Sequence, residues 1–147
     1  GEVAFGNAGH SPHLHRRGDG IDEWVHLPWG LALRIDGSAE FETSAVQMAP
    51  GDTLVLYTDG VTEAMSSSHA QFQEQGLEDT VKAAAGSDPE ALVGAIASAV
   101  TAFATGEPQS DDITVLVLRY NGAAEEAEAD PRRLRPQFVS STPQVSG

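Results

Sequence analysis

Two apolar runs, each next to aspartates, constrain most strongly what this chain can fold into. Residues 53–58 are followed at once by Asp59, and residues 113–118 come directly after Asp111 and Asp112. Runs of this length and composition predict buried β-strands. The ends of such strands can bring distant aspartates together, and gathered carboxylate oxygens are the usual ligands of Mg²⁺, Mn²⁺ or Ca²⁺. A divalent metal site is therefore the first hypothesis.

The composition limits the classes of partner. The chain has 147 residues, enough for one domain with its own core, and a formal net charge of -14. Most of the negative charge lies outside the last 25 residues, which hold four acidic and three basic side chains. Such a field repels nucleic acids and anionic membranes, so the sequence predicts neither as a partner and favours cations or a basic protein surface.

The sequence also indicates a cellular location. It contains no cysteine, which excludes disulfides, thiolate metal sites and cysteine nucleophiles and fits a reducing compartment. No stretch approaches the roughly 18 apolar residues of a membrane span, and the first residues do not have the layout of a secretion signal. These features predict a cytoplasmic location.

A β-hairpin is predicted near the N-terminus. Residues 12–15 and 21–26 indicate two short strands, and the turn between them contains Asp19 and Gly20, a pair that favours the positive φ of tight turns. Residues 2–7 indicate a further strand.

A second hairpin is predicted in the middle of the chain. Residues 41–48 alternate loosely between apolar and polar side chains and are followed by a turn at residues 49–52. That turn leads directly into residues 53–58, so we expect the two strands to pair with each other.

Two helices are predicted to follow. Residues 71–85 indicate a weak helix, and a second helix begins at Ser87 or Asp88 as N-cap, with Pro89 in its first turn, and ends near Gly106. The apolar face of the second helix carries Leu92, Ile96, Val100 and Phe103. The order strands, helices, strand predicts an α+β class with layered sheets rather than alternating βαβ units.

Each acidic segment also has a simpler interpretation. The pair Asp59 and Gly60 on its own forms a turn more often than a metal site, and Asp111 with Asp112 is as often a solvated loop. Like charges side by side before a buried strand repel each other unless a cation or a helix N-terminus offsets them. The surrounding sequence decides between these interpretations.

The histidines near the N-terminus do not indicate a zinc site. His10, His13 and His15 do not have the spacing of zinc ligands, and we interpret them as loop residues. A catalytic Ser-His-Asp triad is not indicated either, because no glycine-framed serine is present next to His10.

Four motifs, in order, resemble one enzyme family. They are Asn-Ala-Gly-His-Ser-Pro at residues 7–12, Pro-Trp-Gly-Leu at 28–31, Pro-Gly-Asp-Thr-Leu-Val-Leu-Tyr-Thr-Asp-Gly-Val-Thr-Glu-Ala at 50–64, and Asp-Asp-Ile-Thr-Val-Leu-Val-Leu-Arg at 111–119. Together they resemble the PPM (PP2C-like) serine/threonine phosphatases, and within them the bacterial SpoIIE and RsbU branch. The octet at residues 57–64 is the most specific part of the match.

The resemblance implies a PP2C-like β-sandwich flanked by helices, with two Mn²⁺ or Mg²⁺ ions held by aspartates at one edge. It assigns metal-ligand roles to Asp59 and Asp111. Asp112, Gly60 and His10 are further candidates for the metal or its surroundings. No catalytic side chain is assigned with certainty, because the nucleophile of this family is a metal-activated water. The resemblance also assigns no substrate-binding residue.

The reaction implied by the resemblance is hydrolysis of phosphoserine or phosphothreonine. The partner is a phosphorylated regulatory protein, such as an anti-sigma factor antagonist, in a signal transduction pathway of general stress response or sporulation. The alternative is a non-catalytic regulatory or binding module that retains the phosphatase fold.

One departure from the family concerns the first metal aspartate and an Asp-Gly motif, which precede the Asn-Ala-Gly-His segment in the family and are not in this sequence. We therefore expect residues 1–120 to form an incomplete catalytic domain that lacks its N-terminal strands. From residue 121 onward apolar periodicity disappears, so residues 121–147 are predicted to form a disordered tail.

Overall fold

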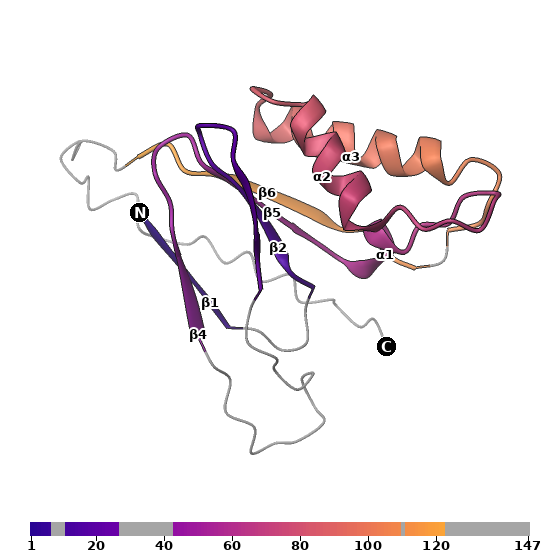
Figure 1. Cartoon of the computed structure of the whole chain (residues 1–147), viewed down its shortest axis with the longest axis horizontal. Coiled ribbons are helices and arrows are strands. Elements are labelled where there is room, and N and C mark those ends of the chain that lie inside the picture. The colour runs from indigo at the N-terminus through magenta and orange to yellow at the C-terminus, as the bar shows by residue number, and fades with distance from the viewer. Residues whose placement is uncertain (7–10, 27–42, 110, 123–147) are drawn as a thin grey trace, which may run out of the picture.

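The computed structural model describes residues 1–6, 11–26, 43–109 and 111–122, and these form strands and helices in separate layers (Figure 1). The predicted α+β class is confirmed. In chain order the elements are β1 (Glu2–Gly6), β2 (His13–Arg16), β3 (Asp22–Val25), β4 (Thr43–Gln47), β5 (Thr53–Tyr57), α1 (Asp59–Thr62), α2 (Gln73–Ala83), α3 (Pro89–Phe103) and β6 (Val115–Arg119).

The strands form two antiparallel sheets. The larger sheet has the order β3-β2-β5-β6, and the smaller one pairs β1 with β4. Helices α2 and α3 lie on one side of the larger sheet, and the β1–β4 pair lies away from them (Figure 1). This arrangement is the predicted layering of a sandwich flanked by helices, within the described residues.

The predicted hairpin between residues 41–48 and 53–58 is wrong. Strand β4 pairs with β1, in a register that places Glu2 opposite Gln47. Both edges of β5 are already occupied, because β2 and β6 pair with it on either side. The turn between β4 and β5 contains Gly51 at a φ of 96° and carries the chain from one sheet to the other.

The hairpin near the N-terminus is confirmed. Strands β2 and β3 pair antiparallel from Arg16 opposite Asp22 onward. Gly20 has a φ of 89°, and the Asp19 side chain accepts a hydrogen bond from the backbone N–H of Ile21 at 3.1 Å. The turn chemistry in the sequence therefore identified the turn correctly.

Both predicted helices are present, and α3 has the predicted N-cap. The Asp88 side chain accepts a hydrogen bond from the N–H of Ala91 at 2.8 Å, and Pro89 is the first helical residue. Gly106 follows the helix with a φ of 94°. No helix among the described residues is long and apolar enough to cross a membrane.

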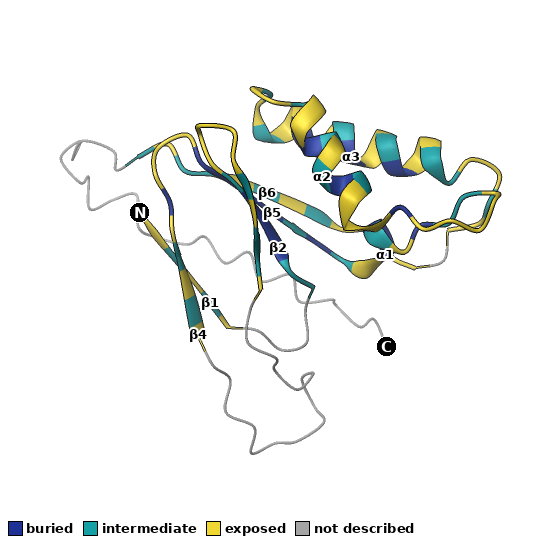
Figure 2. Ribbon diagram, in the orientation of Figure 1, coloured by how far each residue is buried: buried dark blue, intermediate teal, exposed yellow. Residues whose placement is uncertain are grey.

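The hydrophobic core lies between the larger sheet and the two helices. Buried residues are concentrated on β2, β5 and the sheet-facing sides of α2 and α3 (Figure 2). The fully buried members of this core with the largest side chains include Leu14, Val55, Val61, Leu77, Val81, Ile96 and Val100.

The predicted burial of residues 113–118 is only half correct. Val115 and Val117 pack against the core, whereas Leu116 is 58% exposed and Leu118 is 40% exposed. Successive side chains of a strand point to opposite faces, and only one face of β6 meets the helices.

The predicted tail continues beyond residue 122, outside the described residues, and stays a prediction.

Candidate metal site at one end of β5 and β6

The pairing of β5 with β6 brings the two acidic segments to the same end of the sheet. Tyr57, the last residue of β5, lies opposite Val115, the first residue of β6. Asp59 follows β5 after one residue, and Asp111 and Asp112 come shortly before β6. The antiparallel register therefore brings segments about fifty residues apart in sequence to one place, as the sequence predicted.

Two threonines hold these segments together. The backbone N–H of Thr58 donates to the carbonyl of Thr114 at 3.1 Å. The N–H of Thr114 donates in return to the Thr58 hydroxyl at 2.9 Å, and that hydroxyl donates to the carbonyl of Asp112 at 2.7 Å. Sequence reasoning missed this role of Thr58, although a hydroxyl residue directly after an apolar run is a signal for such a contact.

Gly60 makes the closest contact between the two segments. It is buried, and a Cβ atom added to it would lie 2.5 Å from the carbonyl oxygen of Asp112 and 3.1 Å from that of Asp111. A side chain at this position would push the backbones apart, because a separation of 2.5 Å is far below van der Waals contact. The glycine is required by this close approach.

The carboxylates themselves are exposed. The Asp59 side chain accepts a hydrogen bond from the N–H of Gly60 at 3.0 Å, and the Asp111 side chain accepts one from the N–H of Asp112 at 2.7 Å. Asp59 and Asp111 are both exposed to solvent. An ionised carboxylate has about four lone-pair positions, so each of the two side chains keeps acceptor capacity for a further ligand.

The donors fit a hard divalent cation in kind but not in number. Asp59 and Asp111 supply carboxylate oxygens, which suit Mg²⁺ and Mn²⁺. Within the described residues, however, no group of three or more His, Cys, Asp or Glu side chains is placed to hold a metal. His10 and the motif at 28–31 lie outside the described part of the chain. The two aspartates are thus at most part of a site.

The interpretation of His13 and His15 as loop residues is wrong. Both lie in β2 and are buried. The ring of His13 contacts that of Phe5 at a centroid distance of 5.1 Å, which links the two sheets. His15 is hydrogen bonded to Asp52, with 3.1 Å between Nε2 and Oδ2. The predicted strand at residues 12–15 already contained both histidines, and their pairing with residues of β3 and β5 agrees with that strand and not with the loop interpretation.

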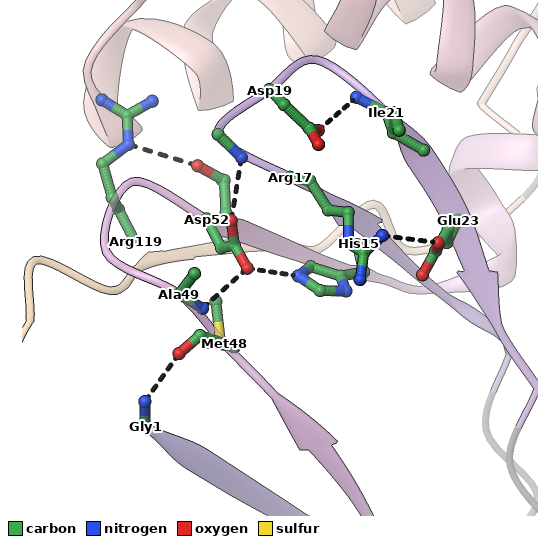
Figure 3. Close-up of polar contacts among 12 residues, drawn as sticks. Gly1, His15, Arg17, Asp19, Ile21, Glu23, Met48, Ala49, Asp52 and Arg119 are labelled. Carbon is green, nitrogen blue, oxygen red and sulfur yellow. Dashed lines mark hydrogen bonds and ion pairs between the residues drawn. The ribbon is translucent and has the colours of Figure 1, made fainter.

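Asp52 is a structural residue that sequence reasoning missed. Asp52 is buried, with 4% of its surface exposed. Its carboxylate accepts hydrogen bonds from the N–H of Gly18 at 2.8 Å, from the N–H of Ala49 at 2.9 Å and from His15 (Figure 3). Burial alone would raise the pKa of Asp52, but these hydrogen bonds and the contact with His15 hold the pKa below its usual value. An aspartate that ends a turn before an apolar run was the available signal.

The chain is similar to a known protein over most of its length. Protein IcfG of Synechocystis sp. is 31% identical over 121 residues, which are 82% of this chain and 19% of IcfG. The similarity therefore concerns a small part of that relative.

Two solved structures share the fold. The SiaA-PP2C domain of Pseudomonas aeruginosa superposes with a TM-score of 0.66 at 24% identity, over 81% of this chain and 46% of that one. The phosphatase domain of the cell fate determinant SpoIIE from Bacillus subtilis gives a TM-score of 0.64 at 23% identity, over 84% of this chain and 52% of that one. The fold is that of PP2C phosphatase domains, and the chain spans about half the length of these two structures.

The family follows from the extent of the sequence match. The family model described as Stage II sporulation protein E (SpoIIE) matches residues 1–121, which include both acidic segments and every described strand and helix. This chain belongs to the SpoIIE family.

Proposed function

We propose that this chain supplies part of the active site of a metal-dependent phosphatase that hydrolyses phosphoserine or phosphothreonine. The observation that carries the proposal is the contact of Gly60 with the backbone of Asp111 and Asp112. It places the exposed carboxylates of Asp59 and Asp111 at one end of β5 and β6, in a chain with a PP2C phosphatase fold. The fold family supports a phosphatase, and the two carboxylates support its dependence on a metal.

Each residue at this end has a proposed role. Asp59 and Asp111 would hold Mn²⁺ or Mg²⁺, of which a complete site contains two. A bound divalent cation lowers the pKa of a water so that hydroxide is available at neutral pH. Gly60 and the backbone of Asp112 keep the two acidic segments in contact. Asp112 and His10 remain further candidates for the metal or its surroundings.

The remaining ligands belong, in this proposal, to parts of the phosphatase domain that the described residues do not include. Two observations support this. The chain spans about half of the solved phosphatase domains, and two carboxylates are fewer ligands than a two-metal site requires. The same shortage of ligands favours the alternative, a non-catalytic regulatory module with the phosphatase fold.

The proposed substrate is a phosphorylated regulatory protein, such as an anti-sigma factor antagonist, in a cytoplasmic signalling or stress response pathway. The relative from Bacillus subtilis is described as a cell fate determinant, which supports a regulatory setting. A metal-activated water needs no cysteine nucleophile, and the chain has no cysteine.

The test is Mn²⁺ binding to the full chain by isothermal titration calorimetry. We expect Asp59→Asn and Asp111→Asn each to weaken Mn²⁺ binding by at least about tenfold, because each removes a charged ligand. Asp79→Asn is the matched control, since Asp79 is an exposed aspartate on α2 that accepts a hydrogen bond from Gln75. Equal Mn²⁺ affinity of the native chain and the Asp59→Asn variant would remove Asp59 from the site.

Activity is measured separately, as hydrolysis of p-nitrophenyl phosphate with excess Mn²⁺. Hydrolysis that is lost in the Asp59→Asn variant and kept in the Asp79→Asn variant would support catalysis by this chain. The non-catalytic alternative predicts no hydrolysis even with excess Mn²⁺, so hydrolysis by the native chain would exclude it.

A further inference from the structure

Thr58 lies between the last residue of β5 and Asp59, and its hydroxyl contacts a distant part of the chain. Its two partners, Asp112 and Thr114, are 54 and 56 residues further along the sequence. Four other threonine hydroxyls each donate to a carbonyl three or four residues earlier, and they belong to Thr62, Thr80, Thr101 and Thr105. The Thr58 hydroxyl therefore makes a tertiary contact, whereas those four make local ones.

The Thr58 hydroxyl takes the place of a backbone carbonyl where β5 and β6 stop pairing. Facing residues of an antiparallel pair can exchange two backbone hydrogen bonds. The N–H of Thr58 donates to the carbonyl of Thr114 at 3.1 Å, but the N–H of Thr114 donates to the Thr58 hydroxyl instead of the Thr58 carbonyl. That carbonyl accepts from the N–H of Val61 at 3.0 Å, at the start of α1. The hydroxyl thus continues the contact between the two acidic segments while the backbone turns into the helix.

This hydroxyl is not used to cap α1. Thr58 is the N-cap residue of that helix, and a threonine there commonly accepts a hydrogen bond from an N–H of the first turn. The Thr58 side chain makes no such bond. It accepts from the N–H of Thr114 and donates to the carbonyl of Asp112 at 2.7 Å, so its donor and an acceptor position are both directed at the second acidic segment. The side chain stabilises the contact between the segments rather than the helix.

The contact lies directly beside both candidate ligands. Thr58 precedes Asp59 by one residue, and Asp112 follows Asp111 by one. Among the described residues, each of the two candidate carboxylates accepts a hydrogen bond only from the N–H of the next residue, so neither holds the other in place. The spacing of Asp59 and Asp111 therefore depends on the backbone contacts. Gly60 allows the segments to approach, and Thr58 bonds across them.

We propose that Thr58 is a positioning residue of the metal site, which acts on Asp111 through the backbone of Asp112. The proposal rests on the proposed function, in which Asp59 and Asp111 hold Mn²⁺ or Mg²⁺. The hydroxyl fixes the second acidic segment against the residue before Asp59, so less conformational entropy is lost when the two carboxylates bind metal. Thr58 is not itself a ligand.

The test is Mn²⁺ binding to the full chain by isothermal titration calorimetry. Thr58→Val replaces the hydroxyl by a methyl group, and we expect it to weaken Mn²⁺ binding by about tenfold, as the loss of groups that orient metal ligands does. Thr58→Ser keeps the hydroxyl and should bind Mn²⁺ within about twofold of the native chain. Thr101→Val is the matched control, because the Thr101 hydroxyl donates to the carbonyl of Ala97 within α3, and it should leave Mn²⁺ affinity unchanged.

Thermal unfolding of each variant shows whether weaker binding comes from an unfolded chain. All titrations are made at a temperature below the unfolding transition of every variant. Thr58→Ala is a second variant without the hydroxyl, and it should lose as much Mn²⁺ affinity as Thr58→Val.

A double-mutant cycle separates positioning from a general structural effect. If Thr58 acts through Asp111, Thr58→Val should weaken Mn²⁺ binding by less than about twofold when Asp111 is already replaced by Asn. An equal loss with and without Asp111 would show that Thr58 supports the fold and does not position this ligand, which would overturn the proposal.

Failure of this inference and failure of the proposed function give different results. Native Mn²⁺ affinity in Thr58→Val and Thr58→Ala, together with weaker binding by Asp59→Asn and Asp111→Asn, would overturn the role of Thr58 alone. Absent Mn²⁺ binding to the native chain, or native affinity in Asp59→Asn, would overturn both. A loss in Thr58→Val that is absent from Thr58→Ser and depends on Asp111 supports the positioning role.

Discussion

The two ends of strands β5 and β6 each carry aspartates, and the aspartates differ in what surrounds them. Asp52, at the start of β5, is buried and accepts hydrogen bonds from two backbone N–H groups and one histidine. Asp59 and Asp111, at the other end, are exposed, and each accepts one hydrogen bond from the next residue's N–H. The same residue type therefore stabilises the fold at one end and remains open to a ligand at the other.

Burial and the number of hydrogen-bond donors distinguish a structural carboxylate from one that can bind a ligand. A buried carboxylate with several fixed donors has little acceptor capacity left, and removing it leaves those donors without a partner. An exposed carboxylate on a closely packed backbone contributes little to stability, yet its position is fixed. In this chain the fixing contact is made by Gly60 rather than by the carboxylates themselves.

The largest effect is expected from Asp52→Ala. The substitution leaves the N–H groups of Gly18 and Ala49 and the ring of His15 without their acceptor, so we expect a loss of about 3–5 kcal/mol in the free energy of unfolding. Urea denaturation measures it. Asp59→Ala is the comparison at the other end and should change stability by less than about 1 kcal/mol. Similar losses for both variants would break the contrast between the two ends.

Gly60→Ala should have the next largest effect. The added methyl group would lie 2.5 Å from the carbonyl oxygen of Asp112, so we expect a loss of about 2–3 kcal/mol in the free energy of unfolding. Gly94→Ala is the matched control, because Gly94 lies in α3 with open space at its Cβ position, and it should stabilise the chain by about 0.5–1 kcal/mol. If Gly60→Ala were also stabilising, the close approach of the two acidic segments would be disproved.

The smallest effect is a change of stability with pH. Since the folded state lowers the pKa of Asp52, its contribution is present above the ordinary value of about 3.9 and is lost as the pH falls through the folded pKa. We expect the stability advantage of the native chain over Asp52→Asn to be constant at neutral pH and to shrink below about pH 4, in urea titrations from pH 7 to pH 3. A stability advantage that stays constant down to pH 3 would contradict the lowered pKa of Asp52.

Local chemistry made much of the fold predictable. Asp88 and Pro89 marked the start of α3, and Asp19 and Gly20 marked the β2–β3 turn, because caps and tight turns depend on a few adjacent residues. The partner of β4 was not predictable, since adjacent strands in sequence commonly pair and only the full set of strands shows that both edges of β5 are occupied. The exposed face of β6 was missed for a similar reason, because an apolar run does not show how many layers cover it.

The sequence named candidate residues for the metal site, whose role as ligands stays a prediction, but it did not show how the two acidic segments are held together. The sequence by itself determined that Asp59 and Asp111 follow and precede apolar strands, and it identified the family through motifs that are local in the chain. Only the tertiary structure decided that Gly60 contacts the backbone of the second segment and that Asp52 is buried beside His15. The physical reason is that strand pairing and side-chain burial join residues far apart in sequence, whereas propensities and turn chemistry act between neighbours.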